Sequence, residues 1–203
     1  MSLVHALDID REITSGTELP VGASRPTVFA DARELARRGF ERVRWMPGNV
    51  GYVVIRSLEP VGEARHAALA ALGMLCQTRA MIIDLREAGG GDRAMAALIA
   101  SHFFDTESAC ADESYLRPGS RLPAAMAAPR TRYAAREVYV LVGPRTSGAA
   151  EDLARNLQAL GRATVVGAMT ESGFRPDIIA ASAVALELAH NTALRLLALR
   201  DAA

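Results

Sequence analysis

The chain has 203 residues, half of them hydrophobic, and its 23 basic and 23 acidic residues give a formal net charge of zero at pH 7. This length predicts one domain with a small appendage. The balanced charge argues against a nucleic-acid or polyanionic partner. Every basic residue is an arginine, so the chain has no lysine that could take part in catalysis.

The cysteines are too few for a disulfide framework, and no metal-ligand spacing accompanies Cys76 and Cys110. We therefore expect no metal site and no cofactor. The N-terminus lacks the basic and then apolar run of a signal peptide, and no apolar stretch approaches the roughly 20 residues that span a bilayer. These features predict a soluble, cytoplasmic protein without a membrane partner.

The first predicted elements are a helix and two strands. Residues 26–38 can form a helix that ends at Gly39, a residue suited to the position after a helix. Apolar and charged residues alternate from Phe40 to Trp45, as in a half-exposed strand. Pro47–Gly48–Asn49 then predicts a turn into a second strand, Val50 to Ser57.

Beyond the second strand, helical and strand patterns alternate. In chain order they are the helix Gly62–Cys76, the strand Ala80–Arg86, the helix Arg93–Phe104, the strand Glu137–Val142, an amphipathic helix from Ser147 to Gly161, the strand Ala163–Ala168 and the helix Ala180–Ala203. Prolines, glycines and short polar runs indicate that Thr106–Arg136 lies outside the alternating strands and helices and forms an insertion, such as a hairpin or a lid.

The alternation of strands and helices predicts βαβ units, and hence an α/β fold with a mostly parallel sheet. We divide the chain into a small helical appendage, residues 1–38, and an α/β core domain, residues 39–203. In such sheets ligands bind at the carboxyl ends of the strands. Gly89–Gly91 and Ser147 each follow a strand end, so we expect them to face one crevice.

Two interpretations of Ser147 stay open at this point. A serine between a strand and a helix most often caps the helix through its side chain. The same position suits a nucleophile, because the strand end is rigid and the helix N-terminus offers free backbone N–H groups. Gly89–Gly91 could bring further N–H groups close to an oxyanion or form only a tight turn, and the segment does not match a phosphate-binding motif.

No histidine or carboxylate stands out as a general base. His66, His102 and His190 occur in alanine-rich helix patterns, and the helical rise places His102 about 15 Å from the glycine loop. Asp84 lies inside a buried strand, where a carboxylate needs a partner, and we expect a structural ion pair with Arg86. Other carboxylates near strand ends are interpreted as caps or solvated charges: Glu87, Asp92, Glu151 and Asp152.

Three segments carry a family signal: GFERVRWMPGNVGY (39–52), MIIDLREAGGGDRAMAALIASHFF (81–104) and VYVLVGPRTSGAAEDLARNLQALGRATVVG (138–167). Together they resemble the C-terminal processing (tail-specific) serine peptidases, especially the branch that contains the interphotoreceptor retinoid-binding protein. Gly173–Leu197, with its turn Phe174–Asp177, is similar to the family's closing segment. The resemblance implies a crotonase-like (ClpP/crotonase) core of ββα units. It also implies hydrolysis of peptide bonds near chain termini, with a peptide or protein as substrate.

The chain departs from the family at the nucleophile, whose pattern in this branch is Thr-aromatic-Ser-x-Ala-Glu. Aligned on Thr146, Ala150 and Glu151, the nucleophile's place holds Gly148 and the aromatic's place holds Ser147. A stretch expected between Gly167 and Phe174 is also absent. The resemblance then implies that Ser147 is the nucleophile only if the turn has shifted its register.

The resemblance also implies an oxyanion site made of backbone N–H groups from Gly148 and from Gly90 or Gly91. It supplies no base, because the Ser–Lys type needs a lysine and no histidine matches the other branch. Three functions stay open: a serine peptidase that uses Ser147, a non-catalytic relative that binds peptides or forms homo-oligomers through the same crevice, and another hydrolase such as an esterase.

Overall fold

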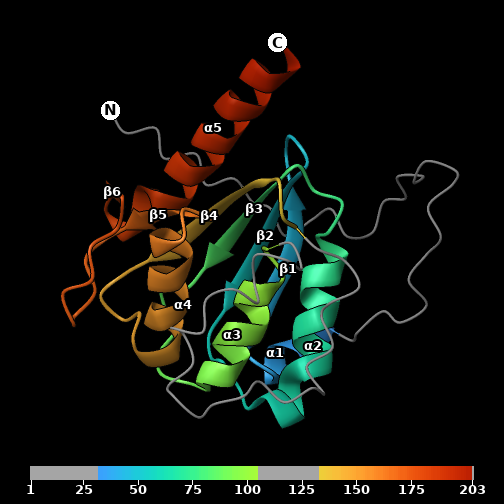
Figure 1. Ribbon diagram of the computed structural model, residues 1–203, viewed down its shortest axis with the longest axis vertical. Coiled ribbons are helices and arrows are strands. Elements are labelled where there is room, and N and C mark those ends of the chain that lie inside the picture. The colour runs from blue at the N-terminus through green and yellow to red at the C-terminus, as the bar shows by residue number, and fades with distance from the viewer. Residues whose placement is uncertain (1–31, 105–132, 203) are drawn as a thin grey trace, which may run out of the picture.

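The computed structural model describes residues 32–104 and 133–202, which include one six-stranded sheet in the order β1-β2-β3-β4-β5-β6 (Figure 1). β1 (Phe40–Met46) is antiparallel to β2 (Val50–Ile55), and every other neighbouring pair is parallel. The parallel strands that follow are β3 (Ala80–Asp84), β4 (Glu137–Val142), β5 (Thr164–Gly167) and β6 (Ile178–Ile179). All carboxyl ends of the parallel strands therefore lie at one edge of the sheet.

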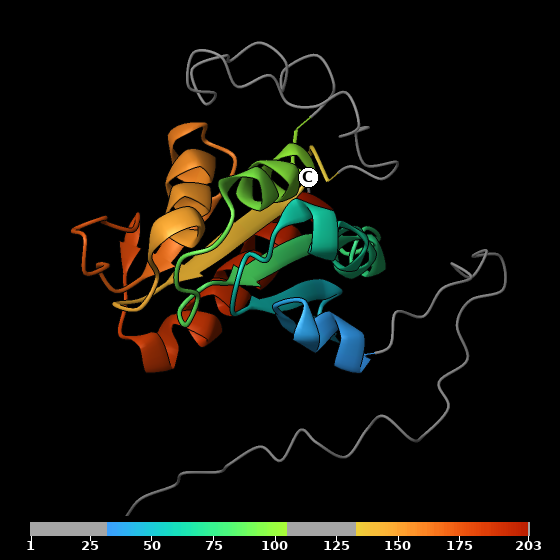
Figure 2. The same cartoon turned by 90° about the horizontal axis from the view of Figure 1, so that it is seen from below.

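Helices cover both faces of this sheet. α2 (Val61–Met74), α3 (Arg93–Ser101) and α4 (Gly148–Ala159) lie on one face, and α5 (Ser182–Asp201) crosses the other (Figure 2). The expected α/β fold with a mostly parallel sheet is confirmed. The short helix α1 (Ala32–Arg37) packs on β1 and buries Leu35 in the core. The division of the chain at residue 38 stays a prediction.

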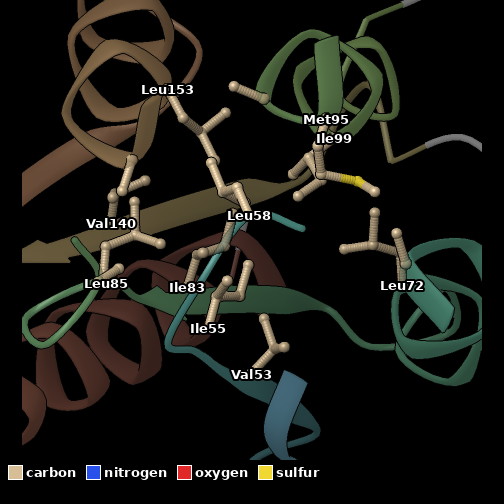
Figure 3. Close-up of a cluster of buried hydrophobic side chains, with 14 of the residues drawn as sticks. Val53, Ile55, Leu58, Leu72, Ile83, Leu85, Met95, Ile99, Val140 and Leu153 are labelled. Atoms are coloured by element: carbon tan, nitrogen blue, oxygen red, sulfur yellow. The ribbon is translucent and has the colours of Figure 1, made fainter. Parts of the chain in front are cut away.

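Successive side chains of the buried strands alternate between two hydrophobic clusters, one on each face of the sheet. In β3, Met81 and Ile83 point to the face of α2, α3 and α4, whereas Ala80 and Ile82 point to α5. Figure 3 shows the larger of the two clusters, in which side chains from the helices meet Ile83 and Val140. Every residue of β3 is buried, as a central parallel strand requires.

The predicted boundaries differ from the observed ones at a few places. α5 begins at Ser182, and not at Ala180, because the Ala180 N–H donates to the Gly167 carbonyl beside the β5–β6 ladder. β6 was not predicted, since two residues are too few to show an alternating pattern. Parts of two predicted segments, 26–38 and 106–136, fall outside the described residues.

Candidate functional site

The loops after β3 and β4 are in direct contact at the carboxyl edge of the sheet. The Gly90 N–H donates to the Ser147 carbonyl at 3.1 Å, and the Ser147 N–H donates to the Ala88 carbonyl at 3.1 Å. A Cβ placed on Gly89 would lie 3.5 Å from Ser147 Oγ. The structure thus brings Ser147 and the glycine loop together at one edge of the sheet, as the order of strands and helices predicts. We call the site between Ser147 and Gly89–Gly91 the crevice, after the expectation from sequence.

At two positions of this crevice only glycine fits, because the backbone has a positive φ and a neighbouring atom leaves no room for a Cβ. Gly91 has φ +103°, and a Cβ there would lie 2.7 Å from Leu58 Cβ. Gly148 has φ +57°, and its Cβ would lie 2.8 Å from Gly90 Cα. Residues with side chains rarely adopt such φ values. The position that the family resemblance assigns to the nucleophile therefore has no room for a serine in this conformation.

The backbone N–H groups of the crevice are not equivalent. Gly90 donates to the Ser147 carbonyl, so its N–H is not available to an oxyanion in this conformation. The expected role of Gly90 as an oxyanion donor therefore stays a prediction that requires this bond to break. Within residues 32–104 and 133–202, the N–H groups of Gly91 and Gly148 have no hydrogen-bond acceptor. A ligand oxygen can accept from these two donors.

Ser147 occupies the N-cap position of α4, but its side chain makes no capping hydrogen bond. The serine is exposed, and its backbone is extended, with φ −149° and ψ 166°. The neighbouring Thr146 stabilises the turn instead: its Oγ1 donates to the Leu85 carbonyl at 2.7 Å and accepts from the Gly143 N–H at 2.9 Å. The interpretation of Ser147 as a side-chain cap is therefore wrong.

The described histidines lie away from Ser147. His102 is buried at the C-cap of α3, at the opposite end of that helix from the glycine loop. His190 Nε2 hydrogen-bonds the Pro47 carbonyl at 2.9 Å, in the turn that precedes β2, so it too lies at the amino edge of the parallel strands. His66 is exposed on α2, and α3 lies between α2 and α4 (Figures 1 and 2).

Asp84, at the end of β3, is buried, and both of its carboxylate oxygens accept hydrogen bonds. It accepts hydrogen bonds from Tyr52 Oη at 2.7 Å, from Arg86 Nη2 at 2.6 Å and Nε at 2.9 Å, and from the Arg86 N–H. Burial alone would raise the pKa of Asp84, but these bonds outweigh it and hold the pKa below its usual value. The expected structural pair with Arg86 is confirmed, and sequence reasoning missed Tyr52.

Arg86 and Tyr52 extend this contact to other parts of the sheet. Arg86 Nη1 also donates to the Ser182 carbonyl at the start of α5, so the pair fastens α5 to the carboxyl edge. Burial, together with the negative charge of Asp84, raises the pKa of Tyr52 to about 12. The phenol thus stays a hydrogen-bond donor to Asp84 at neutral pH.

Glu151, in the first turn of α4, is buried rather than solvated, which corrects its interpretation from sequence. Its carboxylate accepts from Ser172 Oγ at 2.5 Å and from Arg155 Nη2 at 2.5 Å. Burial would raise the pKa of Glu151, but hydrogen bonds from Ser172, Thr170 and Arg155 hold it below its usual value. The Phe174 N–H donates to Thr170 Oγ1 at 3.0 Å, so Glu151 anchors a folded loop beside the crevice.

Other features of the described residues do not point to a second reactive centre. A cavity of about 470 Å³ lies where β4 and β5 begin, at the edge opposite Ser147. Two arginines that line it donate to backbone carbonyls, Arg136 to Thr78 and Arg162 to Phe103. Among the described residues there is no group of three or more metal-ligating side chains and no helix long and apolar enough to cross a membrane.

Comparisons with known proteins agree with this architecture. Residues 49–175 match the model of the family described as Peptidase family S41. The structure of a putative S41 protease from Bacteroides fragilis has a TM-score of 0.56 at 16% identity, covering 79% of this chain and 57% of that one. A lipoprotein from Streptococcus agalactiae gives 0.55 at 11% identity, covering 75% and 68%.

A third structure, a photosystem II D1 C-terminal processing protease, has a TM-score of 0.45 at 17% identity, covering 69% of this chain and 45% of that one. The chain thus spans about half the length of this protein and of the putative S41 protease. At these identities, the likeness to the Bacteroides and Streptococcus structures is one of fold.

Proposed function

Because this chain belongs to peptidase family S41, we propose that the crevice between Ser147 and the glycine loop binds an extended peptide segment. The observation that carries the proposal is a pair of N–H groups, on Gly91 and Gly148, that lack acceptors within the described residues beside an exposed serine. A peptide carbonyl oxygen is a matching acceptor for such donors. The substrate or ligand is then a peptide or an unfolded segment of a protein.

The same geometry supports slow or no hydrolysis by this chain. A serine hydroxyl is a weak nucleophile at neutral pH unless a neighbouring base takes its proton. The chain has no lysine, and His66, His102 and His190 lie on other elements. Without an activated base, an oxyanion site and substrate binding retain only about 10³- to 10⁴-fold acceleration over water.

A second candidate is peptidase activity through Ser147 itself, in a turn that has shifted by one residue relative to the family pattern. It is favoured by the closeness of Ser147 Oγ to the glycine loop, 3.5 Å from a Cβ placed on Gly89. In that reaction Ser147 Oγ attacks the carbon of the scissile carbonyl and gives its proton to water, and the N–H groups of Gly148 and Gly91 stabilise the oxyanion. The C–N bond then breaks, the departing amine takes a proton from water, and a second water hydrolyses the acyl–Ser147 ester. Cleavage near chain termini would belong to this second candidate.

Peptide binding is tested by fluorescence anisotropy with a labelled, unstructured peptide and a variant that fills the crevice. Gly89→Leu places a side chain beside Ser147 at a residue whose φ is not positive, so the backbone can accept it. We expect at least about tenfold weaker binding, equivalent to about 1.4 kcal/mol. The matched control is Gly62→Leu on α2, where a Cβ meets no atom within 4 Å. Equal affinity of Gly89→Leu and wild type would exclude this crevice as the peptide site.

Catalysis is tested separately with a fluorophosphonate probe and an unstructured peptide substrate, on wild type and Ser147→Ala. The proposal predicts peptide binding without covalent labelling and without cleavage above background. Labelling confined to Ser147, together with cleavage that is lost in Ser147→Ala, would establish the second candidate in its place.

A further inference from the structure

α5 carries several large apolar side chains that stay exposed among the described residues. The inner face places Ala185, Ala189, Ala193 and Leu197 against the sheet, where all four are buried. Opposite or beside them, four large apolar side chains are exposed: Val184 (50%), Leu188 (37%), Leu196 (37%) and Leu199 (67%). α5 crosses the face of the sheet opposite α2, α3 and α4 (Figure 2).

Two charges accompany these apolar residues. Glu187 and Arg195 are exposed on α5, and neither has an ion-pair partner within residues 32–104 and 133–202. The charges at the end of the helix differ, because Arg200 pairs with Glu137 and Asp201 pairs with Arg79. The middle of α5 therefore carries one acid and one base that are left for an external contact.

The arrangement along α5 is symmetric. Three pairs of residues share nearly the same midpoint: Val184 with Leu199, Leu188 with Leu196, and Glu187 with Arg195. The midpoints fall on or between Asn191 and Thr192, a spread of about one residue, or about 1.5 Å along the axis. A two-fold interface requires this kind of self-complementary surface, in which each residue meets its counterpart across the axis.

We propose that α5 forms a dimer interface by packing antiparallel on α5 of a second copy of this chain. A two-fold axis beside Asn191 and Thr192 places each Glu187 opposite Arg195 of the second copy, so two ion pairs form at once. Leu188 and Leu196 then meet beside these pairs, and Val184 and Leu199 meet farther from the axis, so apolar contacts flank each ion pair. The three residue pairs with a common midpoint are what a two-fold interface requires, whereas an unrelated partner would need no such symmetry. A second copy of this chain is therefore the partner that matches the surface.

The test measures the monomer–dimer equilibrium by sedimentation equilibrium and exploits the reciprocal charges. Glu187→Arg and Arg195→Glu each place like charges opposite one another twice per dimer, and like-charge contacts across an interface are unfavourable. We expect each single variant to raise the dimer dissociation constant at least about tenfold. The double variant Glu187→Arg/Arg195→Glu restores opposite charges and should return to within about threefold of wild type.

The matched controls are Glu171→Arg and Arg175→Glu, which change the same charges on exposed residues outside α5. They should dimerise like wild type, and circular dichroism verifies that every variant is folded. A wild-type chain that stays monomeric throughout the measured range would overturn the proposal. So would single variants that dimerise like wild type, or a double variant that stays as weak as the singles.

Discussion

Two polar residues at the carboxyl edge of the same sheet, Asp84 and Ser147, are held in opposite ways. Asp84 is 4% exposed and accepts four hydrogen bonds from Tyr52 and Arg86. Ser147 is exposed, its side chain does not cap α4, and its position is fixed only through its backbone. The difference separates a residue that holds the architecture from one that is left free to meet a ligand. The predictions below test this separation from its largest expected effect to its smallest.

The largest effect is expected at Asp84. Asp84→Asn keeps the shape of the side chain but removes the charge that compensates Arg86, which is itself only partly exposed. Breaking a buried pair by changing one partner costs about 3 to 5 kcal/mol of stability. Urea denaturation monitored by circular dichroism measures this loss.

The control for Asp84 is Asp201→Asn, which removes the acid of the exposed pair with Arg79 and should leave the denaturation midpoint unchanged. If Asp84→Asn unfolds at the same urea concentration as wild type, Asp84 does not stabilise the carboxyl edge of the sheet. The contrast between a structural Asp84 and a free Ser147 would then be wrong.

The next effect concerns the backbone of the crevice. Gly148→Ala and Gly161→Ala both place a side chain at a similar φ, +57° and +61°. The added Cβ meets Gly90 Cα at 2.8 Å in the first variant and nothing within 4 Å in the second. Gly161→Ala should cost about 1 kcal/mol for the left-handed backbone alone, and Gly148→Ala about 2 to 4 kcal/mol because the loop must also shift. Equal losses of stability would show that the contact between the two loops is loose.

Glu151 tests whether the loop beside the crevice depends on a charge. Glu151→Gln weakens the hydrogen bonds with Ser172 and Arg155, and hydrogen bonds to charged groups contribute about 1.5 to 3 kcal/mol. We expect a stability loss of about 1 to 3 kcal/mol at pH 7. Glu171→Gln, an exposed neighbour on the same loop, serves as the control and should stay within about 0.5 kcal/mol of wild type.

The effect of Glu151 should also depend on pH. Its pKa in the folded chain lies below the ordinary value of 4.5. The carboxylate therefore contributes its full stabilisation above the unfolded pKa, and the contribution is lost as the pH falls through the folded pKa. Thermal denaturation from pH 7 to pH 3.5 should show the gap between wild type and Glu151→Gln narrowing on acidification. A gap that stays constant would assign the effect to packing instead of charge.

The sequence predicted what depends on local periodicity. The order of the helices and strands, the parallel sheet and the meeting of Ser147 with the glycine loop all follow from short patterns and the direction of βαβ units. What it missed depends on contacts between distant residues. Tyr52 reaches Asp84 from a strand 32 positions away, and Ser172 covers Glu151 from a loop 21 positions away. No local pattern marks either contact.

The smallest loss of stability is expected at Ser147. Its neighbour Thr146 provides the comparison, because the two residues occupy adjacent positions in the same turn. Thr146→Val leaves the Gly143 N–H and the Leu85 carbonyl without their buried partner, which should cost about 1 to 3 kcal/mol. Ser147→Ala removes an exposed hydroxyl without a capping bond, so its stability should stay within about 0.5 kcal/mol of wild type. Urea denaturation of both variants measures the difference. A loss near 1 kcal/mol in Ser147→Ala would mean that the hydroxyl caps α4 in solution. In that case it is committed to the fold, and it cannot at the same time be the group that the crevice presents to a peptide.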